Sequence, residues 1–504
     1  MLQLQGQHIL ILGLGASGMA MARWCVRMGA EVVVADTREH PPQQSALQQE
    51  LPGVRCVGGT FTADLVQGTA CRAVFVSPGL APSVSAPVLD AARASGLWVG
   101  GELSLFAQAL HDLKADRGYA PQVLAITGTN GKTTVTSLTG QLVARAGHSV
   151  QVAGNIGPTL LDTLTAALDT ALPEVWVLEL SSFQLENAGG FEPTAATVLN
   201  LSQDHLDWHG SMAAYAQAKS HVFGQNALMV LNRDDAAVMA MLPEPVRVKL
   251  QKPQVRPHVT FGAGMPQRPG DFGIEVLNGM AWLVRALEAD ETRKRRKDEE
   301  EELHIQRLIP ADALRIRGRH NAVNALSALA LACSAGCALA PMLYGLREYR
   351  GEPHRVESVG IIHDVEYFDD SKGTNVGATV AALQGLGAER RVVVILGGEG
   401  KGQDFAPLAQ PVASFARAVV LIGQDAPVLR VQLQDAGVPL IDAQDMGDAV
   451  DKASAAAQAG DAVLLSPACA SFDMFENYVH RAEVFGQAVA AHAQAAGVVV
   501  EALA

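Results

Sequence analysis

Short runs of aliphatic and β-branched residues alternate along the chain with longer segments that carry apolar residues at helical spacing. The first hundred residues contain such runs at 8–12, 31–35 and 74–76, with a helical segment at 16–28. Short apolar runs are typical of buried strands, and strands that alternate with helices favour a parallel sheet covered by helices. The pattern therefore predicts an α/β fold.

The same alternation returns twice more along the chain. After a polar stretch at 111–117, further apolar runs occur at 123–126, 175–178, 197–199, 391–396, 418–422 and 462–465. A length of 504 residues is also typical of about three domains. We predict three α/β domains in series, with mostly parallel sheets and with bounds at 1–100, 101–351 and 352–504.

Two stretches depart from this alternation. Residues 322–346 carry no charge, but Gly336 and Pro341 interrupt them, so we expect a buried helix and no membrane insertion. Residues 288–302 are dominated by charge and include five consecutive basic residues at 293–297. Such a run is typical of a solvated loop, and we interpret it as an exposed insertion in the central domain.

The net charge and the cysteines indicate which partners and which cellular compartment to expect. The chain has 38 Lys and Arg against 52 Asp and Glu, a net charge of −14, and this acidic balance argues against a nucleic-acid partner. Its six cysteines form no CxxC pair, and the first residues lack the basic segment of a signal peptide. We expect a cytoplasmic monomer with reduced thiols.

The first glycine-rich loop, Gly13 to Gly18, follows the run at 8–12 and opens the helical segment, and Asp36 ends the next strand. Backbone amides at a helix start favour a diphosphate, and an acidic side chain after the second strand can bind a ribose hydroxyl. Alone, this fingerprint is typical of a nicotinamide dehydrogenase, but any nucleotide diphosphate fits it, and a turn without ligand stays an alternative.

The second loop lies between the strand at 123–126 and a helix, and it reads Gly128-Thr-Asn-Gly-Lys-Thr-Thr134. Its amides can hold phosphates, Lys132 can neutralise β- and γ-oxygens, and the Thr133 hydroxyl can bind Mg²⁺. The loop is a variant of the common phosphate-binding loop, because Ile126 stands where that motif has its first glycine. A dehydrogenase does not need this second loop, so the pair indicates ATP-driven chemistry on a nucleotide-linked substrate.

Further motifs make the chain resemble the Mur ligases of peptidoglycan synthesis, and among them the glutamate-adding members, over essentially its whole length. The motifs are GNIG at 154–157, LELSSFQLE at 178–186, NLSQDHLD at 200–207, Lys219, GRHNAVN at 318–324, PHR at 353–355, DDSKGTN at 369–375, GGEGK at 397–401 and LSPACASFD at 465–473. The resemblance implies a Rossmann-like first domain that binds UDP, a P-loop-type ATPase as the second domain, and a Rossmann-like third domain that closes on ATP and binds glutamate. It also implies ATP, Mg²⁺ or Mn²⁺ at two sites, and an acyl-phosphate route that joins D-glutamate to UDP-N-acetylmuramoyl-L-alanine.

The resemblance also assigns roles to residues. Catalytic roles fall to Lys132, Glu179, His205 and Lys219; Thr133, Glu179, His205 and a carbamylated Lys219 would hold the metals. ATP contacts would come from Gly128, Thr129, Asn130, Gly131, Lys132, Thr133, Thr134, Asn321, Asn324, Arg355, Asp370 and Lys372. The UDP-linked substrate would contact Gly15, Ala16, Ser17, Gly18, Asp36, Thr37, Arg38, Ser77, Gly79, Asn155, Ser181 and Gln184, and glutamate would contact Thr374, Lys401, Ser471, Phe472 and Tyr478.

Several alternatives stay open at this point. Taken singly, Glu179 reads as a carboxylate at a strand end, His205 as a capping or core histidine, and Lys219 as a surface lysine on a helix. Thr133 stands where the family commonly has Ser, and Tyr478 where it often has Phe. A related ligase for another amino acid or for folate, a nicotinamide oxidoreductase with a fused ATPase, and a non-catalytic nucleotide-binding scaffold are the competing functions.

Overall fold

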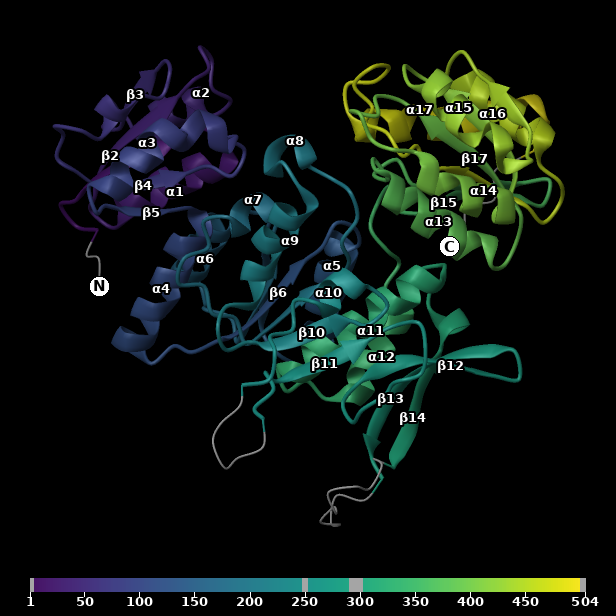
Figure 1. Cartoon of the computed structure of the whole chain (residues 1–504), viewed down its shortest axis with the longest axis horizontal. Helices are drawn as coiled ribbons and strands as arrows, with labels where there is room; N and C mark the ends of the chain where they lie inside the picture. Colours follow the sequence, from purple (N-terminus) through teal and green to yellow (C-terminus); the bar gives the residue numbers. More distant parts are fainter. Residues whose placement is uncertain (1–3, 247–252, 290–301, 499–504) are drawn as a thin grey trace. The chain divides into compact units, whose positions relative to one another are not determined.

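The computed structural model describes residues 4–246, 253–289 and 302–498. Within these residues the chain forms four β-sheets, most of whose strands are parallel and joined through helices (Figure 1). The described residues divide into two compact units. Unit 1 comprises Met1–Leu201, His205–Phe261 and Ser327–Gly345, and unit 2 comprises Ser202–Asp204, Gly262–Leu326 and Leu346–Ala504.

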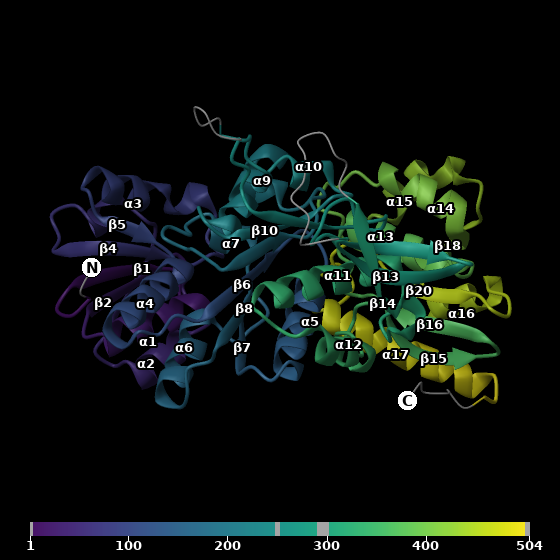
Figure 2. The same ribbon diagram turned by 90° about the horizontal axis from the view of Figure 1, so that it is seen from below.

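The first sheet of unit 1 has the strand order β3-β2-β1-β4-β5, and all its neighbouring strands are parallel. Helices α1 and α2 cover one face and α3 the other (Figure 2). The strands are β1 (His8–Leu12), β2 (Glu31–Asp36), β3 (Arg55–Gly58), β4 (Cys71–Val76) and β5 (Trp98–Gly100), and the helices are α1 (Ala16–Arg27), α2 (Gln44–Glu50) and α3 (Pro82–Ala94). The carboxyl ends of parallel strands share one edge, so the loops after β1, β2 and β4 meet there.

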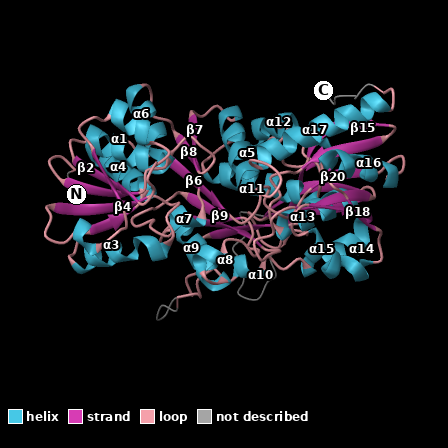
Figure 3. Cartoon of the chain, turned by 90° about the horizontal axis from the view of Figure 1, so that it is seen from above, coloured by secondary structure: helices cyan, strands magenta, loops and turns pink. Residues whose placement is uncertain are grey.

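The second sheet of unit 1, also parallel, has the order β11-β10-β9-β6-β8-β7. Helix α5 lies on one face and α9 on the other (Figure 3). The strands are β6 (Gln122–Thr127), β7 (Val150–Gly154), β8 (Val175–Glu179), β9 (Ala195–Val198), β10 (Leu228–Asn232) and β11 (His258–Phe261). The helices are α4 (Glu102–Arg117), α5 (Lys132–Arg145), α6 (Leu160–Asp169), α7 (Ser182–Leu185), α8 (Leu206–His209), α9 (Met212–Ser220) and α10 (Ala236–Met239).

A single hydrophobic core joins these two sheets, because Ile9 and Val34 of the first belong to the same buried cluster as Val123 and Trp176 of the second. Helices α1, α4 and α6 pack against one another in this core. Two ion pairs reinforce the contact between α1 and α6: Arg23 with Asp162 at 3.1 Å and Arg27 with Asp169 at 2.6 Å. The polar stretch predicted to separate the first two domains is the last part of α4.

Unit 2 contains a small antiparallel sheet that the sequence pattern did not predict. Its strands are β12 (Phe272–Leu277), β13 (Met280–Glu288) and β14 (Leu303–Pro310). The charged run at 288–302 connects β13 to β14, and its five basic residues lie outside the described residues. The interpretation as a surface insertion therefore stays a prediction.

The second sheet of unit 2 has the order β15-β16-β20-β17-β18-β19 and is parallel except for the β15–β16 pair. Residues of α13, α14 and α15 pack on one face, and residues of α16 and α17 on the other. The strands are β15 (Glu357–Ile362), β16 (Val365–Asp369), β17 (Val392–Gly397), β18 (Ala416–Ile422), β19 (Leu440–Asp442) and β20 (Ala462–Leu465). The helices are α13 (Val376–Gly387), α14 (Ala409–Phe415), α15 (Ala426–Leu433), α16 (Met446–Ala456) and α17 (Tyr478–Ala495). The predicted α/β class with mostly parallel sheets is confirmed, and the domain bounds stay predictions.

The uncharged stretch at 322–346 does not form the one helix that we expected; it lies in two helices, α11 (Arg319–Ser334) and α12 (Leu339–Glu348). Gly336, in the left-handed region at φ 85°, ends the first as predicted. Pro341 does not break the second; it lies in the first turn of α12, where its missing N–H costs no helical bond. Within the described residues, every helix is too short or too polar to span a bilayer. All six cysteines are free thiols.

Candidate active site

The predicted phosphate loop joins β6 to α5 in unit 1. Gly128 and Gly131 have φ values of 154° and 81°, so both need the conformational freedom of glycine. The Lys132 ammonium folds back over the loop and donates hydrogen bonds of 2.9 Å to the carbonyl oxygens of Gly128 and Thr129. Strand, loop and helix thus have the geometry that a phosphate-binding loop requires.

Asn200, which follows β9, stabilises the conformation of this loop. Its role was not predicted from the sequence. Its side chain accepts from the Asn130 amide at 2.8 Å and donates to the Asn130 carbonyl at 3.1 Å, and its backbone carbonyl accepts from the Thr129 amide at 3.0 Å. Asn200 opens the NLSQDHLD motif, and that position was the signal that pointed to it. The bonds fix the loop before any ligand binds.

Lys219 on α9 is not the surface lysine that the helical pattern suggests, because it is 1% exposed. Its ammonium donates to the Gly128 carbonyl oxygen at 2.9 Å and to the Thr127 hydroxyl at 3.3 Å, and it lies 4.7 Å from the centre of the Tyr215 ring. The Tyr215 hydroxyl lies 3.2 Å from that of Thr129. The ammonium group of this buried lysine thus contacts the phosphate loop from helix α9.

Glu179 ends β8 directly beside the phosphate loop, where Ile126 of β6 is its register partner. One carboxylate oxygen, Oε1, accepts a 2.7 Å hydrogen bond from the Asn155 side chain. The other, Oε2, is buried and has no hydrogen-bond partner. A buried carboxylate oxygen without a partner is costly in free energy, and a hard cation is the ligand that would satisfy it.

His205 lies on the surface at the start of α8, with the uncommon backbone φ of 52°. Its ring contacts that of Phe183 at 4.8 Å, and its side chain does not cap the helix. His209, one turn on, contacts the Ser182 hydroxyl at 2.9 Å, and burial lowers the pKa of His209 to about 4. An exposed imidazole and a neutral one therefore lie on the same short helix.

Ser181 and Gln184 satisfy one another at the start of α7. The Ser181 hydroxyl accepts from the Gln184 amide at 3.3 Å, and the Gln184 side-chain oxygen accepts from the Ser181 amide and hydroxyl at 3.0 Å. The side-chain amide nitrogen of Gln184 is the group that remains for the predicted substrate contact.

The predicted diphosphate loop lies at the carboxyl edge of the first sheet. The carboxylate of Asp36, 1% exposed, accepts hydrogen bonds from the Leu14 amide at 2.7 Å and from the amide and guanidinium of Arg38 at 2.6–2.9 Å. These hydrogen bonds outweigh burial and lower the pKa of Asp36 to about 2. Asp36 therefore stabilises the conformation of the loop. Its carboxylate already accepts four hydrogen bonds, which leaves no acceptor position for a ribose hydroxyl.

The remaining residues of this pocket lie around the same edge. Gly18 packs so closely on the loop that a Cβ atom would lie 1.9 Å from the Gly13 carbonyl oxygen. The amide of Ser77, after β4, donates to the carbonyl of Leu12 at 2.8 Å. The residues that face solvent there are Ala16, Thr37, Arg38 and Gly79, whereas Gly15 and Ser17 are half-buried.

In unit 2, the predicted adenine contacts Asn321 and Asn324 lie in the first turns of α11. The side-chain nitrogen of Asn321 donates to the Arg317 carbonyl at 2.8 Å, and that of Asn324 donates to the Asn321 side-chain oxygen at 3.1 Å. Asn321 is buried, whereas Asn324 is half-buried. The pair forms a rigid amide edge that suits a base with donors and acceptors.

The loop between β16 and α13 gathers several predicted residues of unit 2. Burial raises the pKa of Asp370 to about 7, and its carboxylate accepts a 2.6 Å hydrogen bond from Ser466. The Lys372 ammonium lies 3.8 Å from the centre of the Tyr478 ring, a cation–π contact. His354, which precedes Arg355, contacts Asp369 at 2.7 Å and so ties the PHR segment to this loop.

Arg481 on α17 organises this loop, and sequence reasoning missed it. Its guanidinium is 1% exposed and donates to the Ser371 hydroxyl and carbonyl at 2.9 and 2.7 Å and to the Cys469 carbonyl at 3.1 Å. A charged residue inside an otherwise apolar helix face was the available signal. Its hydrogen bonds stabilise two segments that contain predicted site residues. One is the loop with Asp370, Lys372 and Thr374, and the other contains Ser471.

The predicted glutamate residues do not all share one environment. Ser471 is 3% exposed, whereas the adjacent Phe472 is 65% exposed and lies 5.4 Å from the Lys401 ammonium. The Thr374 carbonyl accepts from the side chain of Gln403 at 3.5 Å. Lys401 has a φ of 51°, in the left-handed region, and lies between Gly400 and Gly402.

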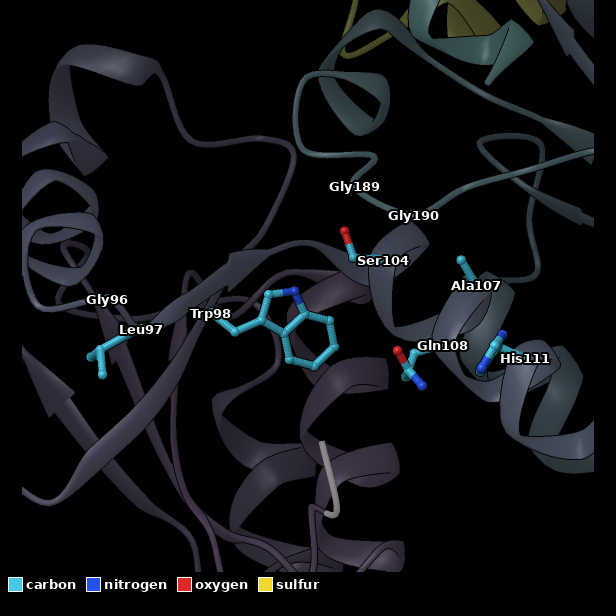
Figure 4. Close-up of a pocket in the computed structure, with 9 residues that line it drawn as sticks. All are labelled: Gly96, Leu97, Trp98, Ser104, Ala107, Gln108, His111, Gly189 and Gly190. Carbon is cyan, nitrogen blue, oxygen red and sulfur yellow. The ribbon is translucent and has the colours of Figure 1, made fainter. Parts of the chain in front are cut away.

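Two cavities are lined by described residues of unit 1. One, of about 620 Å³, lies between β5, α4 and the loop of Gly189 and Gly190, with Trp98 and His111 on its wall (Figure 4). It contains none of the predicted site residues. The other, of about 170 Å³, contains Ser77 on one side and Phe183 and Trp208 on the other. The smaller cavity thus extends from the predicted sugar-nucleotide edge toward the helix that carries His205.

Comparison with known proteins identifies related chains. Family models match at residues 7–101 (Mur ligase MurD-like, N-terminal domain), 126–332 (Mur ligase middle domain) and 354–469 (Mur ligase, glutamate ligase domain). A curated relative from Albidiferax ferrireducens is 71% identical over 495 residues, which cover 98% of each chain, and one from Polaromonas sp. is 61% identical over 99% of this chain and 100% of the relative. A third, from Burkholderia pseudomallei, is 57% identical over 96% and 97%. All three are named UDP-N-acetylmuramoylalanine–D-glutamate ligase.

Solved structures share the fold. The MurF ligase of Thermotoga maritima in complex with ADP has a TM-score of 0.55 at 14% identity and covers 98% of this chain and 100% of its own. The UDP-N-acetylmuramate-alanine ligase MurC of the same organism has a TM-score of 0.51 at 20% identity and covers 96% and 99%.

Proposed function

The chain belongs to the Mur ligase family, whose enzymes are ATP-dependent amide ligases, and we propose that it joins D-glutamate to UDP-N-acetylmuramoyl-L-alanine in peptidoglycan precursor synthesis in the cytoplasm. The names of relatives at 57–71% identity support this pair of substrates. The observation that carries the proposal is the convergence of Lys132 and Lys219 on the Gly128 carbonyl, beside the unpartnered oxygen of Glu179.

The reaction needs an activated acid. A carboxylate is a poor electrophile, so its oxygen first attacks the γ-phosphorus of ATP, ADP leaves, and a mixed anhydride forms. The neutral amine of glutamate then attacks the carbonyl carbon, the C–O bond to phosphate breaks, and the amine loses a proton. Both steps gather negative charge at one point, where catalysis depends on positioned cations and hydrogen-bond donors.

The phosphate loop provides the first of these groups. The Lys132 ammonium, held at 2.9 Å from two loop carbonyls, is placed to exchange them for β- and γ-phosphate oxygens. The amides of residues 128–134 and the Thr133 hydroxyl complete the cradle. From unit 2, Asn321 and Asn324 fit the adenine base, and Arg355, Asp370 and Lys372 fit the phosphates or ribose of ATP.

Family members use ATP with Mg²⁺, and the chain offers suitable ligands. The Glu179 Oε2 atom and the Thr133 hydroxyl would hold one ion, and the exposed His205 imidazole with Lys219 would hold a second. When bound, the metal supplies charge neutralisation between the phosphate and the acceptor carboxylate. Asn155 positions Glu179 by its hydrogen bond to Oε1, so that Oε2 would be the oxygen that holds the ion.

Lys219 has a coherent role as a carbamate. The ammonium first gives up one proton; the resulting neutral amine attacks CO₂, a C–N bond forms and a second proton leaves, so that the cationic side chain becomes an anionic oxygen ligand. Its 1% exposure disfavours the ammonium form and so favours the reactive amine. The carbamate would then be a ligand for the second metal.

The substrates occupy the remaining groups. Gly15, Ala16, Ser17 and Gly18 fit the diphosphate, and Thr37, Arg38, Ser77 and Gly79 fit the uridine end. Asp36 supports this pocket from behind, and Asn155, Ser181 and Gln184 fit the muramoyl-alanine arm. Thr374, Lys401, Ser471, the Phe472 amide and Tyr478 fit the two carboxylates and side chain of glutamate, and we expect a monomer to carry the complete set.

Phosphate release under defined substrates tests the proposal. The purified protein with ATP and Mg²⁺ should release phosphate only when UDP-N-acetylmuramoyl-L-alanine and D-glutamate are both present. A panel of L- and D-amino acids, with folate and NADH as further arms, decides among the competing functions. Preference for another amino acid, folate-dependent release or NADH oxidation would each overturn it.

A further inference from the structure

A buried carboxyl group lies where helices of unit 1 begin. Glu102, the first residue of α4, is 2% exposed. Its Oε1 atom accepts a 3.0 Å hydrogen bond from the amide of Leu161, the second residue of α6. Its Oε2 atom is buried and has no hydrogen-bond partner. A half-satisfied buried carboxyl group is costly, so a further partner is expected during function.

The nearest candidate partner belongs to the diphosphate loop. Ser17, the second residue of α1, acts on Glu102 closely enough to lower its pKa, although no hydrogen bond of normal geometry to Oε2 is formed. Helices α1, α4 and α6 pack against one another around this point. Glu102 thus lies between the sugar-nucleotide loop and the helix that follows the Asn155 loop.

The surroundings of Glu102 favour its neutral form. Burial, and to a smaller extent the carboxylate of Asp162 on α6, raise the pKa of Glu102 to about 7, although the amides of Leu161 and Leu160 and the Ser17 side chain act to lower it. Arg23 on α1 pairs with Asp162 at 3.1 Å and with Glu50 at 2.7 Å. Among the residues that the structure describes, Glu102 forms no ion pair. A neutral carboxyl group keeps one O–H donor.

We propose that Glu102 is a positioning residue for the sugar-nucleotide substrate: as a neutral acid it donates a hydrogen bond from Oε2 to the Ser17 hydroxyl oxygen, so that the Ser17 hydrogen points to the substrate's diphosphate. The inference rests on the proposed function, because it takes the loop of Gly15 to Gly18 as the diphosphate site. The three groups form a chain of hydrogen bonds in which each oxygen has a defined direction.

Ionisation of Glu102 reverses this chain. The carboxylate accepts the hydrogen of Ser17, which turns that hydrogen away from the diphosphate and places a negative charge behind it. Binding therefore selects the protonated form, and an enzyme whose Glu102 is ionised takes up one proton when the substrate binds. The substrate's diphosphate diester and terminal carboxylate are fully ionised near neutral pH, so the proton goes to the protein.

Calorimetric titration of UDP-N-acetylmuramoyl-L-alanine into the full chain tests this inference, in buffers with different ionisation enthalpies. The number of protons that the wild type takes up per bound substrate should increase from pH 6 to 8. Its Kd should rise about tenfold across that range, as expected when only the protonated fraction binds. Glu102→Gln keeps an N–H donor toward Ser17 and cannot ionise. Its Kd should therefore stay flat with pH, without the proton uptake.

Two further variants make the result specific. Glu50→Gln changes a largely exposed carboxylate that also contacts Arg23, and it should keep the wild-type pH profile. In a Ser17→Ala background, the Glu102→Gln substitution should no longer change the pH dependence. If Glu102 had only a structural role, the Kd of Glu102→Gln and that of the wild type would depend on pH in the same way.

The outcomes separate the two proposals. Absence of proton uptake by the wild type, or equal uptake in wild type and Glu102→Gln, with normal binding and turnover, would overturn the role of Glu102 alone. Absence of substrate binding in the wild type would overturn the proposed function with it.

Discussion

Lys132 and Lys219 share one acceptor: both ammonium groups donate to the carbonyl oxygen of Gly128, each at 2.9 Å. Lys132 comes from the start of α5 and Lys219 from the end of α9. Two like charges at one carbonyl disfavour each other's charged form. The more deeply buried of the two, Lys219, is therefore the one that we expect to lose its proton and react.

The first prediction concerns Lys219→Ala, which removes the amine that the proposal makes a carbamate. Turnover should fall by about 10²-fold or more, the size typical of removing one charged group at a reacting centre. Acetate or another short carboxylate should restore part of it by replacing the lost oxygen ligand. The measurement is phosphate release with and without acetate.

Two lysine variants control this experiment. Lys219→Arg keeps the charge but cannot form a carbamate, so it should stay inactive. Lys452→Ala, on α16 of unit 2, should behave as wild type. Full turnover of Lys219→Ala without any carboxylate would contradict the carbamate.

The second prediction concerns Asp36→Asn. The bonds from Leu14 and Arg38 hold the pKa of Asp36 at about 2, below its usual 3.8, and a depressed carboxyl pKa stabilises the fold above pH 4. The variant should lose about 2 kcal/mol of stability at pH 7. This difference should shrink as the pH falls from 4 to 2, because the wild-type carboxylate then becomes protonated.

Thermal unfolding at pH 7 and at pH 3 measures this loss of stability. The KM for the sugar nucleotide should also rise, because the loop loses hydrogen bonds that fix its conformation. Asp90→Asn is the matched control, since the Asp90 side chain is 73% exposed. Equal melting temperatures of Asp36→Asn and wild type at pH 7 would show that the carboxylate does not support the loop.

The third prediction concerns Arg481→Met. The substitution keeps apolar bulk but leaves the carbonyl oxygens of Ser371 and Cys469 without their donor. Buried polar groups that lose a charged partner cost roughly 3 kcal/mol. Unit 2 should melt earlier, and the KM for ATP or glutamate should rise because the loop of Asp370 and Lys372 loses its support.

Differential scanning calorimetry resolves this change, and Arg430→Met is its control, because the Arg430 side chain is 39% exposed. An unchanged melting profile of Arg481→Met together with an unchanged KM would refute the supporting role.

The fourth prediction concerns pH and His320 of α11. Burial lowers the pKa of His320 to about 4, and its Nδ1 atom has no hydrogen-bond partner. Between pH 6.5 and 4 the unfolded chain binds a proton there that the folded chain does not, so stability falls as the pH falls. The loss should approach about 3 kcal/mol at pH 4.

Urea unfolding of wild type and His320→Gln at pH 7, 5.5 and 4.5 measures this contribution. The variant should lose less stability on acidification, whereas the exposed His363→Gln should follow the wild type. Parallel curves for wild type and His320→Gln would place the acid sensitivity elsewhere.

Much of the fold follows from local sequence pattern. Residues 8–12 and 462–465 form the strands β1 and β20 with the predicted bounds, because a short apolar run between turn residues can be buried on both faces of a parallel sheet. The antiparallel strands β12 to β14 were not predicted. They carry alternating polar residues and long side chains, and antiparallel pairing is decided by the neighbouring strand.

The candidate site divides in the same way. The two glycine-rich loops between a strand and a helix could be predicted, since such a glycine pattern specifies its own backbone conformation, whereas their ligands stay predictions. The contacts of Asn200 and Arg481 and the burial of Lys219 were not predicted, because each depends on a partner far along the chain. Arg481, for instance, reaches Ser371 across 110 residues.

By itself, the sequence determined many of the buried strands of the parallel sheets, the two glycine-rich turns between a strand and a helix, and the family. Only the tertiary structure decided that Lys219 lies inside the protein and meets a carbonyl 91 residues away. The physical reason is the range of the forces involved. Helix and strand preferences act between near neighbours in the chain, whereas burial and hydrogen-bond partners are fixed by which distant segments pack together.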